Sequence, residues 1–208
     1  MSRSIEKQMF RTLVVAVLWL AAAICMWPCP AFAVDTNNET SVNDPPGKWA
    51  LTVYGGIGID GGIADIPTFT AEFNSAYMLD VACSREVAKW WQDRFSLEVE
   101  GQVAKHFEMQ HHSEVNALIL ARWLKFPWNH RVRTSFAVGE GVSYASSVPT
   151  IEKNRSPDKT SQFLNYMVYE LELAPPDKCP WGFIARVHHR SGVQGLYNGV
   201  VRGSNIVG

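Results

Sequence analysis

The sequence has no marked excess of charge of either sign. Its 208 residues carry 19 Lys and Arg against 20 Asp and Glu, a formal net charge of −1 at pH 7. Nucleic-acid-binding chains are usually basic or carry a basic patch, so nucleic acid is not expected as a partner. Charged residues make up 19% of the chain, below the roughly 25% usual in soluble domains. Hydrophobic residues reach 47% and aromatic residues 12%, which argues against a disordered chain and fits a protein with a large apolar exterior.

Long hydrophobic runs are also missing after the N-terminus, so no transmembrane helix is expected there. The N-terminus itself has the pattern of an export signal. Three basic residues, the last of them Arg11, precede the apolar stretch 12–26, and Ala31-Phe32-Ala33 matches an A-x-A cleavage site. An uncleaved signal anchor is the alternative. We predict three segments: a signal peptide over 1–33, a flexible N-terminal segment over 34–47 and an outer-membrane β-barrel over 48–208.

Cysteine is scarce once the signal is removed. Of the 4 Cys, only Cys83 and Cys179 lie after residue 33. An exported chain meets an oxidising compartment, which permits a disulfide between them. Two unpaired thiols are the alternative, and two cysteines do not make a disulfide scaffold.

Apolar residues alternate with small or polar residues along most of the chain, as in β-strands with two unlike faces. In 95–104, Glu98 and Glu100 share one face while Leu97 and Val99 occupy the other. The pattern predicts eight strands, within 49–58, 73–84, 95–104, 115–123, 132–143, 166–173, 183–188 and 204–208. The last is shorter than the ~9–11 residues of a membrane strand. We therefore expect a truncated sequence or an incomplete strand, with a weak closing seam against the first strand.

Such alternation suits either a soluble barrel with an apolar interior or a membrane barrel with an apolar exterior. The face opposite the apolar set carries five acids and three bases, which a small membrane barrel must enclose and pair. These residues are Asp80, Glu98, Glu100, Glu170, Glu172, Arg122, Arg133 and Arg186.

The aromatic residues favour the membrane barrel. Six of the eight Trp lie after residue 33, and counting the strands places all six at one rim. Another aromatic set falls toward the opposite rim: Phe73, Tyr77, Phe107, Tyr144, Phe163 and Tyr166. Two aromatic girdles are typical of a membrane barrel. The connections agree, since 59–72 and 146–162 are long and 126–130 and 174–180 are short; the connector 85–94 is expected to form a helical turn. The predicted fold is all-β, an eight-stranded antiparallel up-and-down transmembrane β-barrel.

A histidine and a serine follow the seventh strand on its apolar face. Continuing the alternation of Phe183, Ala185 and Val187 puts His189 and Ser191 on the lipid side. Polar groups there are costly unless they have a use. An imidazole can take the proton of a nearby hydroxyl and so activate it as a nucleophile. Such a pair would meet lipid ester bonds within the membrane; a purely structural use of the two residues is the alternative.

Three segments on this strand pattern resemble the outer-membrane lipid A 3-O-deacylases, or acyloxyacyl hydrolases: His189-Arg190-Ser191-Gly192, Asn198-Gly199 and Gly203-Ser204-Asn205. The resemblance implies an eight-stranded barrel with a H-x-S motif on its outer surface. Such enzymes remove the ester-linked acyl chain at the 3-position of lipid A, without a metal or cofactor. On this resemblance His189 is the general base and Ser191 the nucleophile. The partner is lipid A of the outer leaflet, and the location is the cell outer membrane.

Two positions depart from the family pattern. Gly192 stands where the family usually has Asn, so that only its backbone N–H is left for an oxyanion. No acid occurs between Gly192 and Gly208, where the family has its third triad residue, a Glu. Asn205 is the candidate to orient the imidazole instead, as Asn does in Cys-His-Asn enzymes. The competing hypotheses are a non-enzymatic barrel, structural or adhesive, with a decayed motif, and a soluble lipocalin-like carrier, which the Trp girdle disfavours.

We expect the remaining polar residues to have structural and not catalytic roles. His106, Glu108, His111 and His112 are assigned to an exposed loop rather than a metal site. His188 is expected inside, in the charge network with Arg186. We do not interpret the interior carboxylates as the catalytic carboxylate pair of a glycosidase, because an eight-stranded barrel has room inside only for side chains. Glu140 interrupts the apolar face and has no assigned role.

Overall fold

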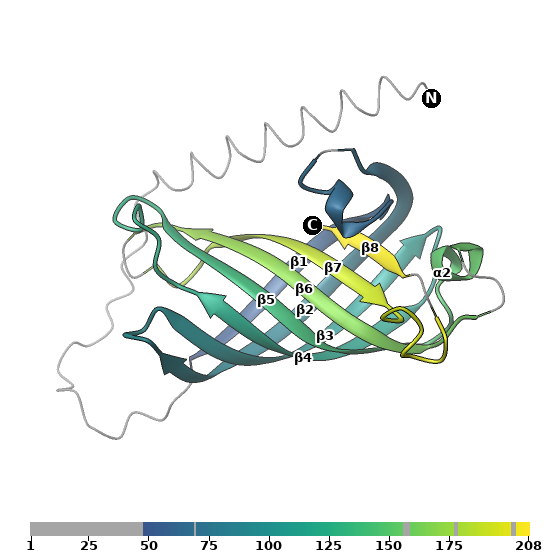
Figure 1. Ribbon diagram of the computed structural model, residues 1–208. Helices are drawn as coiled ribbons and strands as arrows, with labels where there is room; N and C mark the ends of the chain where they lie inside the picture. Colours follow the sequence, from purple (N-terminus) through teal and green to yellow (C-terminus); the bar gives the residue numbers. More distant parts are fainter. Residues whose placement is uncertain (1–47, 69, 156–158, 177–178, 201–202) are drawn as a thin grey trace.

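The computed structural model describes residues 48–68, 70–155, 159–176, 179–200 and 203–208 (Figure 1). The expected signal peptide 1–33 and the segment 34–47 lie outside these residues. Eight strands form: β1 (Trp49–Asp60), β2 (Glu72–Trp90), β3 (Phe95–Glu108), β4 (Ser113–Trp123), β5 (Arg133–Ala145), β6 (Phe163–Ala174), β7 (Phe183–Ser191) and β8 (Ser204–Val207). A 3-10 turn η1 (Ile63–Asp65) follows β1, and the short helix α2 (Thr150–Arg155) lies between β5 and β6. Among the described residues, no helix is long and apolar enough to cross a membrane.

Each strand pairs antiparallel with the next, and β8 pairs with β1, so that the sheet closes into a barrel (Figure 1). All eight expected strands are confirmed. The last strand is short, and its seam with β1 has three register pairs, against eleven between β1 and β2. Two backbone hydrogen bonds between Gly208 and Arg186, of 2.7 and 2.9 Å, extend the β7 side of β8 by one residue.

Alternate residues of each strand point into the barrel and out of it, as the sequence predicted. In β4, Glu114, Asn116 and Leu118 are buried while Val115 and Ile119 are exposed. The outward set is mostly apolar, with side chains such as Leu51, Val53, Leu79, Val103 and Val115 at least half exposed. Thr134 is buried near the start of β5, where its hydroxyl accepts the indole N–H of Trp128 (2.9 Å).

Most of the enclosed charges form ion pairs across the interior, whereas Asp80 is buried with no hydrogen-bond partner among the described residues at either carboxylate oxygen. Arg122 binds Glu98 (2.7 Å) and Glu170 (2.8 Å), and reaches Glu172 at 3.5 Å. Arg186 binds Glu100 (2.9 Å) and also Glu170. A buried charge is tolerated only when it is paired, so these arginines allow the carboxylates to remain inside. Arg133, expected in the same network, donates to the carbonyl oxygen of Cys179 (3.1 Å).

The two rims differ in their aromatic residues. Trp49 begins β1, Trp90 ends β2 and Trp123 ends β4, and the rings of Trp90 and Trp91 stack on Phe95. At the opposite rim, five of the six expected aromatic side chains are exposed: Phe73, Tyr77, Phe107, Tyr144 and Phe163. Tyr166 was wrongly placed in this girdle. It lies on the inward face of β6 and is fully buried, with its hydroxyl donating to Gln102 (2.7 Å).

The connector after β2 differs from the one expected, and the two described cysteines are both free. The helical turn expected over 85–94 is wrong, because β2 continues to Trp90 and pairs with β3 up to Phe95, with a register shift between Glu86 and Ala88. A bulge of this kind lets a long strand bend without leaving the sheet. Cys83 and Cys179 are both free, one exposed on β2 and the other buried beyond β6.

Helix α2 lies against the rim opposite the tryptophans (Figure 1). Its Glu152 is buried and binds Arg190, an inward residue of β7, at 2.7 Å, and accepts a hydrogen bond from Ser204 of β8 (3.0 Å). Burial raises the pKa of Glu152 above its ordinary value, and the charge of Arg190 opposes that rise. These contacts join the loop after β5 to the last two strands.

Replacing Arg186 by Met tests the interior network. The variant leaves Glu100 without its arginine, and an uncompensated buried charge costs about 3–5 kcal/mol, so we expect the free energy of unfolding to fall by about that amount. Urea unfolding followed by tryptophan fluorescence measures the change. The matched control is Lys153→Met, at an exposed position of α2, with an expected change within ~0.5 kcal/mol. Equal effects of the two variants would contradict the network's importance.

Candidate functional site

His189 and Ser191 lie at the end of β7, on its outward side. Both are partly exposed, whereas Arg190 between them is fully buried and points into the barrel. This arrangement follows from the period of two along a strand. The structure therefore places both expected site residues on the outer surface of the barrel.

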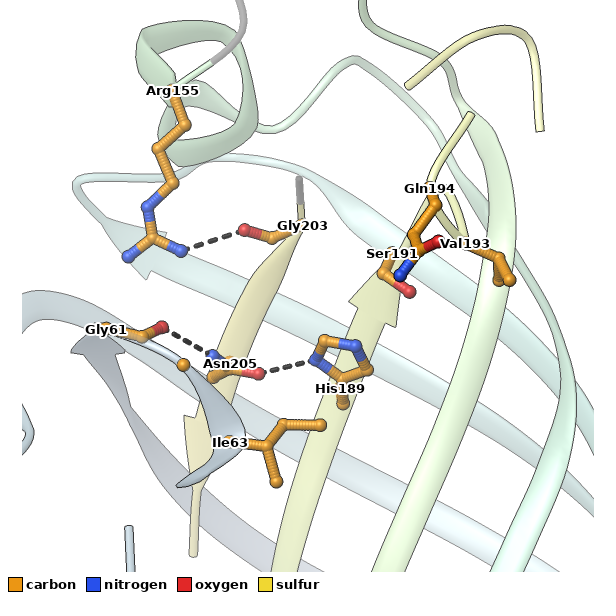
Figure 2. Close-up of a pocket in the computed structure, with 10 residues that line it drawn as sticks. Gly61, Ile63, Arg155, His189, Ser191, Val193, Gln194, Gly203 and Asn205 are labelled. Atoms are coloured by element: carbon orange, nitrogen blue, oxygen red, sulfur yellow. Dashed lines mark hydrogen bonds between the residues drawn. The ribbon is translucent and has the colours of Figure 1, made fainter. Parts of the chain in front are cut away.

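Asn205 of β8 is the cross-strand partner of His189 in the register of β7 and β8. Its side-chain oxygen lies 2.5 Å from His189 Nδ1, and its Nδ2 donates to the carbonyl oxygen of Gly61 (2.9 Å) (Figure 2). The second bond determines the orientation of the amide, because only the NH₂ group can donate to a carbonyl. The Asn205 oxygen must then accept from Nδ1–H, which leaves the lone pair of a neutral imidazole on Nε2.

A pocket of about 490 Å³ opens over this pair. Two loops, one helix and two strand ends meet around it: the loop after β1, helix α2, the loop after β7, and the ends of β7 and β8 (Figure 2). Its size falls within the range of small-molecule pockets. The lining residues are Gly61, Gly62, Ile63, Arg155, His189, Ser191, Val193, Gln194, Gly203 and Asn205.

Arg155 brings positive charge to this pocket from α2. Its guanidinium donates to the carbonyl oxygens of Gly203 (2.8 Å) and Ile59 (3.1 Å) and to the carboxylate of Asp60 (2.9 Å). These bonds tie α2 to the ends of β1 and β8. Arg155 was not singled out in the sequence, because nothing local shows that a residue 34 positions before His189 reaches the same pocket.

Ser191 shares the pocket with His189, although no direct hydrogen bond joins these two described residues. Hydrogen bonds between catalytic groups are often long without substrate and tighten when it binds. Figure 2 shows the Gln194 side chain beside Ser191, on the same side of the pocket. Gln194 is a polar pocket residue that the sequence analysis missed. An amide N–H next to a nucleophile is a donor of the kind that stabilises an oxyanion.

Gly192 is buried and does not line the pocket. A Cβ at this position would lie 1.9 Å from the carbonyl oxygen of Val200, so neither Asn nor any other side chain fits without moving the loop. The next two residues, Val193 and Gln194, have φ of 47° and 51°. Such a conformation is strained for a β-branched residue. The close contact with Val200 explains why this position holds glycine.

Glu140 lies on the same outward side of the barrel as His189. In register, Glu140 of β5 faces Met167 of β6, and Met167 faces His189 of β7. Two strand spacings of about 4.8 Å separate the two backbones. Glu140, which had no assigned role in the sequence, therefore belongs to the same cross-strand row of residues as His189.

The expected exposed loop of histidines is wrong for two of its members. His106 and His112 are buried, with 1% and 2% exposure, because β3 continues beyond 104 and the turn after it folds over the barrel interior. His111 and Glu108 are exposed, as expected. His188 points inward as expected, but its nearest ionic partner is Glu114 (3.1 Å).

Alanine at Gly192 tests the close approach to Val200. Accommodating a Cβ at 1.9 Å requires the loop to shift, and overpacking of this kind costs about 1–3 kcal/mol. Gly101→Ala is the control, since a Cβ there meets no heavy atom within 4 Å. Thermal unfolding of both variants should show a loss for Gly192→Ala alone; two indistinguishable midpoints would contradict the contact.

Comparison of the chain with family models, with curated proteins and with solved structures finds no match. The function is therefore argued from the geometry of the site.

Proposed function

We propose that the protein is an outer-membrane serine esterase that removes an ester-linked acyl chain, at the 3-position, from lipid A. Ser191 is the nucleophile, His189 the general base and Asn205 the residue that orients the base. The observation that carries the proposal is the chain from Gly61 O through the Asn205 amide to His189 Nδ1. It holds a histidine with its basic nitrogen free, in a surface pocket that also contains a serine.

Membrane insertion is supported by the polarity of the barrel. The exterior exposes large apolar side chains along most strands, and the interior holds paired charges. Contiguous apolar surface of this extent is rare on soluble monomers. A closed barrel also satisfies its backbone hydrogen bonds within the sheet, as the hydrocarbon region requires. The aromatic side chains at the two rims suit the two interfaces of a bilayer.

The chemistry follows from the positions of the groups. His189 Nε2 accepts the hydroxyl proton as Ser191 Oγ attacks the ester carbonyl, and the imidazolium then gives this proton to the departing alcohol oxygen. Water, activated by the same nitrogen, releases the fatty acid from Ser191. Asn205 accepts Nδ1–H throughout and keeps the ring in one tautomer. The Gln194 amide is a donor for the oxyanion, in place of the buried Gly192.

The location of the pocket suits a membrane lipid as substrate. It lies at the rim opposite the tryptophans, next to outward apolar strand residues, so that an acyl chain can remain in the membrane during the reaction. Arg155 also lines the pocket, and its charge is paired there with Asp60 (2.9 Å). The apolar surroundings of the pocket therefore support a membrane lipid as the class of substrate.

A non-enzymatic barrel is the second candidate. It is favoured by the lack of a direct hydrogen bond between His189 and Ser191 and of an acid after Ser191. In that case the His189–Asn205 contact only holds β8 against β7, and no reaction takes place in the pocket.

Mass spectrometry of lipid A from a Gram-negative host that produces the protein separates the two candidates. Deacylation removes the mass of one hydroxyacyl chain, and Ser191→Ala should lower the rate by at least about 10³-fold because the nucleophile is lost. Ser75→Ala, at an exposed serine of β2, should leave the rate unchanged. A heat-dependent shift in gel migration verifies that each barrel is folded. An unchanged lipid A spectrum with folded wild-type protein would refute the enzyme.

Substitution of Asn205 tests the orienting role. Asn205→Ala frees the imidazole to rotate, and a misplaced catalytic group costs on the order of 10²-fold, so kcat should fall by that factor with little change in KM. Asn205→Asp should retain more activity than Asn205→Ala, because a carboxylate also accepts Nδ1–H. Asn154→Ala, at an exposed position of α2, is the control. Equal activities of the Ala and Asp variants would show that Asn205 does not act through the imidazole.

A further inference from the structure

Three histidines converge on one carboxylate inside the barrel, beneath the rim opposite the tryptophans. The Nε2 atoms of His106 and His112 lie 3.3 and 2.8 Å from Glu114 Oε1, and Nε2 of His188 lies 3.1 Å from Oε2. All four side chains are about 2% exposed. They come from β3, the turn after it, β4 and β7, so that the cluster spans the barrel interior.

The protons around His188 can be assigned from its neighbours. Gln102 Nε2 donates to Glu100 (2.5 Å), which turns Gln102 Oε1 toward Tyr166. The Tyr166 hydroxyl donates to that oxygen (2.7 Å) and therefore accepts from His188 Nδ1 at 3.0 Å. With its proton on Nδ1, a neutral His188 presents a lone pair on Nε2. That lone pair faces a carboxylate oxygen 3.1 Å away, and a cation between the two atoms, either a proton or a metal ion, makes this contact attractive.

The surroundings of His106 are a second, independent observation that indicates a bound cation. Neither of its ring nitrogens has a hydrogen-bond partner, although the side chain is buried. Its ring is stacked on His112, with centroids 4.1 Å apart and planes 12° from parallel. A buried polar atom without a partner in a native fold requires an explanation, and a bound ion is one that fits a histidine nitrogen.

We propose that this cluster binds one divalent transition-metal ion of the Zn²⁺ type, with His106, His188 and Glu114 as ligands, while His112, stacked on His106, contacts Glu114 Oε1 from beside them. The ligand atoms of the first three lie within 4.8 Å of one another. In a tetrahedral Zn²⁺ site with bonds of about 2.0–2.1 Å, ligand atoms lie roughly 3.3 Å apart. The distances of 2.8–3.3 Å from the histidine nitrogens to Glu114 are close to this value.

The chemistry of the donors agrees with this class of metal. Imidazole nitrogens with one carboxylate suit Zn²⁺, whereas Ca²⁺ and Mg²⁺ prefer oxygen donors. Tyr166 has the position of an outer partner that fixes the tautomer of a ligating histidine, which metal sites commonly possess. The ion would link β3, β4 and β7 from within. The site is separate from the outer pocket, because His188 and His189 point to opposite sides of β7, and it does not depend on the esterase proposal.

Metal content of the folded full-length protein tests the proposal. After treatment with a chelator, the protein is incubated with Zn²⁺ alone and freed of excess, and elemental analysis should find about one Zn²⁺ per chain. Co²⁺ in place of Zn²⁺ should give the intense visible absorption of a tetrahedral site. Bound metal should also raise the unfolding temperature relative to the chelated protein. The absence of bound metal in the folded wild type would overturn the proposal in favour of a proton-sharing cluster.

Matched variants locate the ion. His188→Gln and Glu114→Gln should abolish the Co²⁺ spectrum, and Tyr166→Phe should weaken Zn²⁺ binding by roughly 10–100-fold, as loss of an outer partner does. His111→Gln is the control, because this histidine is exposed next to His112, and it should bind as the wild type does. If His111→Gln loses the metal, the site is on the surface and the proposal fails. If the ligand variants do not fold, the spectra of wild type and His111→Gln still decide.

Discussion

The interior of an eight-stranded barrel is only wide enough for its own side chains, and in this protein that interior is charged. The carboxylates of Glu98, Glu100 and Glu170 share the guanidinium groups of Arg122 and Arg186. No water layer separates these groups, so each charge depends on the partner that another strand supplies. The strand register is therefore constrained from inside, because a shift of one residue would exchange the charged face for the apolar face.

The outer pocket depends on that register. Along β7, Arg186, His188 and Arg190 point inward and are held by Glu170, Glu114 and Glu152, each from a different element. His189 and Ser191 can only point outward. The network thus determines the direction of two side chains that it does not contact. Asn205 and the loop at Gly61 then set the orientation of the imidazole ring.

Much of this arrangement was predictable from the sequence, because alternation is a local property. The eight strands, their two faces and the outward position of His189 and Ser191 all follow from a period of two. Asn205 was chosen on the family resemblance and not on the periodicity. Tyr166 was misplaced when its aromatic character was given more weight than its face. The cluster at Glu114 was not predictable, because it depends on β3 extending to Glu108 and on strands meeting across the barrel. Gln194 and Arg155 were missed since loop geometry brings them to the pocket.

No acidic residue lies between Gly192 and Gly208 to stabilise a positive charge on His189. Asn205 orients the ring but carries no charge to stabilise an imidazolium. Glu140, in the same outward row with Met167 between them, lies two strands away. At about 10 Å and an effective dielectric constant of about 20, a unit charge stabilises another by roughly 1.7 kcal/mol, against about 0.4 kcal/mol in bulk water. A carboxylate too distant to hydrogen-bond can therefore still supply part of the stabilisation, and it does so only where water is excluded. Under the proposed function, Asn205 would orient the imidazole and Glu140 would supply part of the electrostatic stabilisation, which gives the acid on this otherwise apolar face a role.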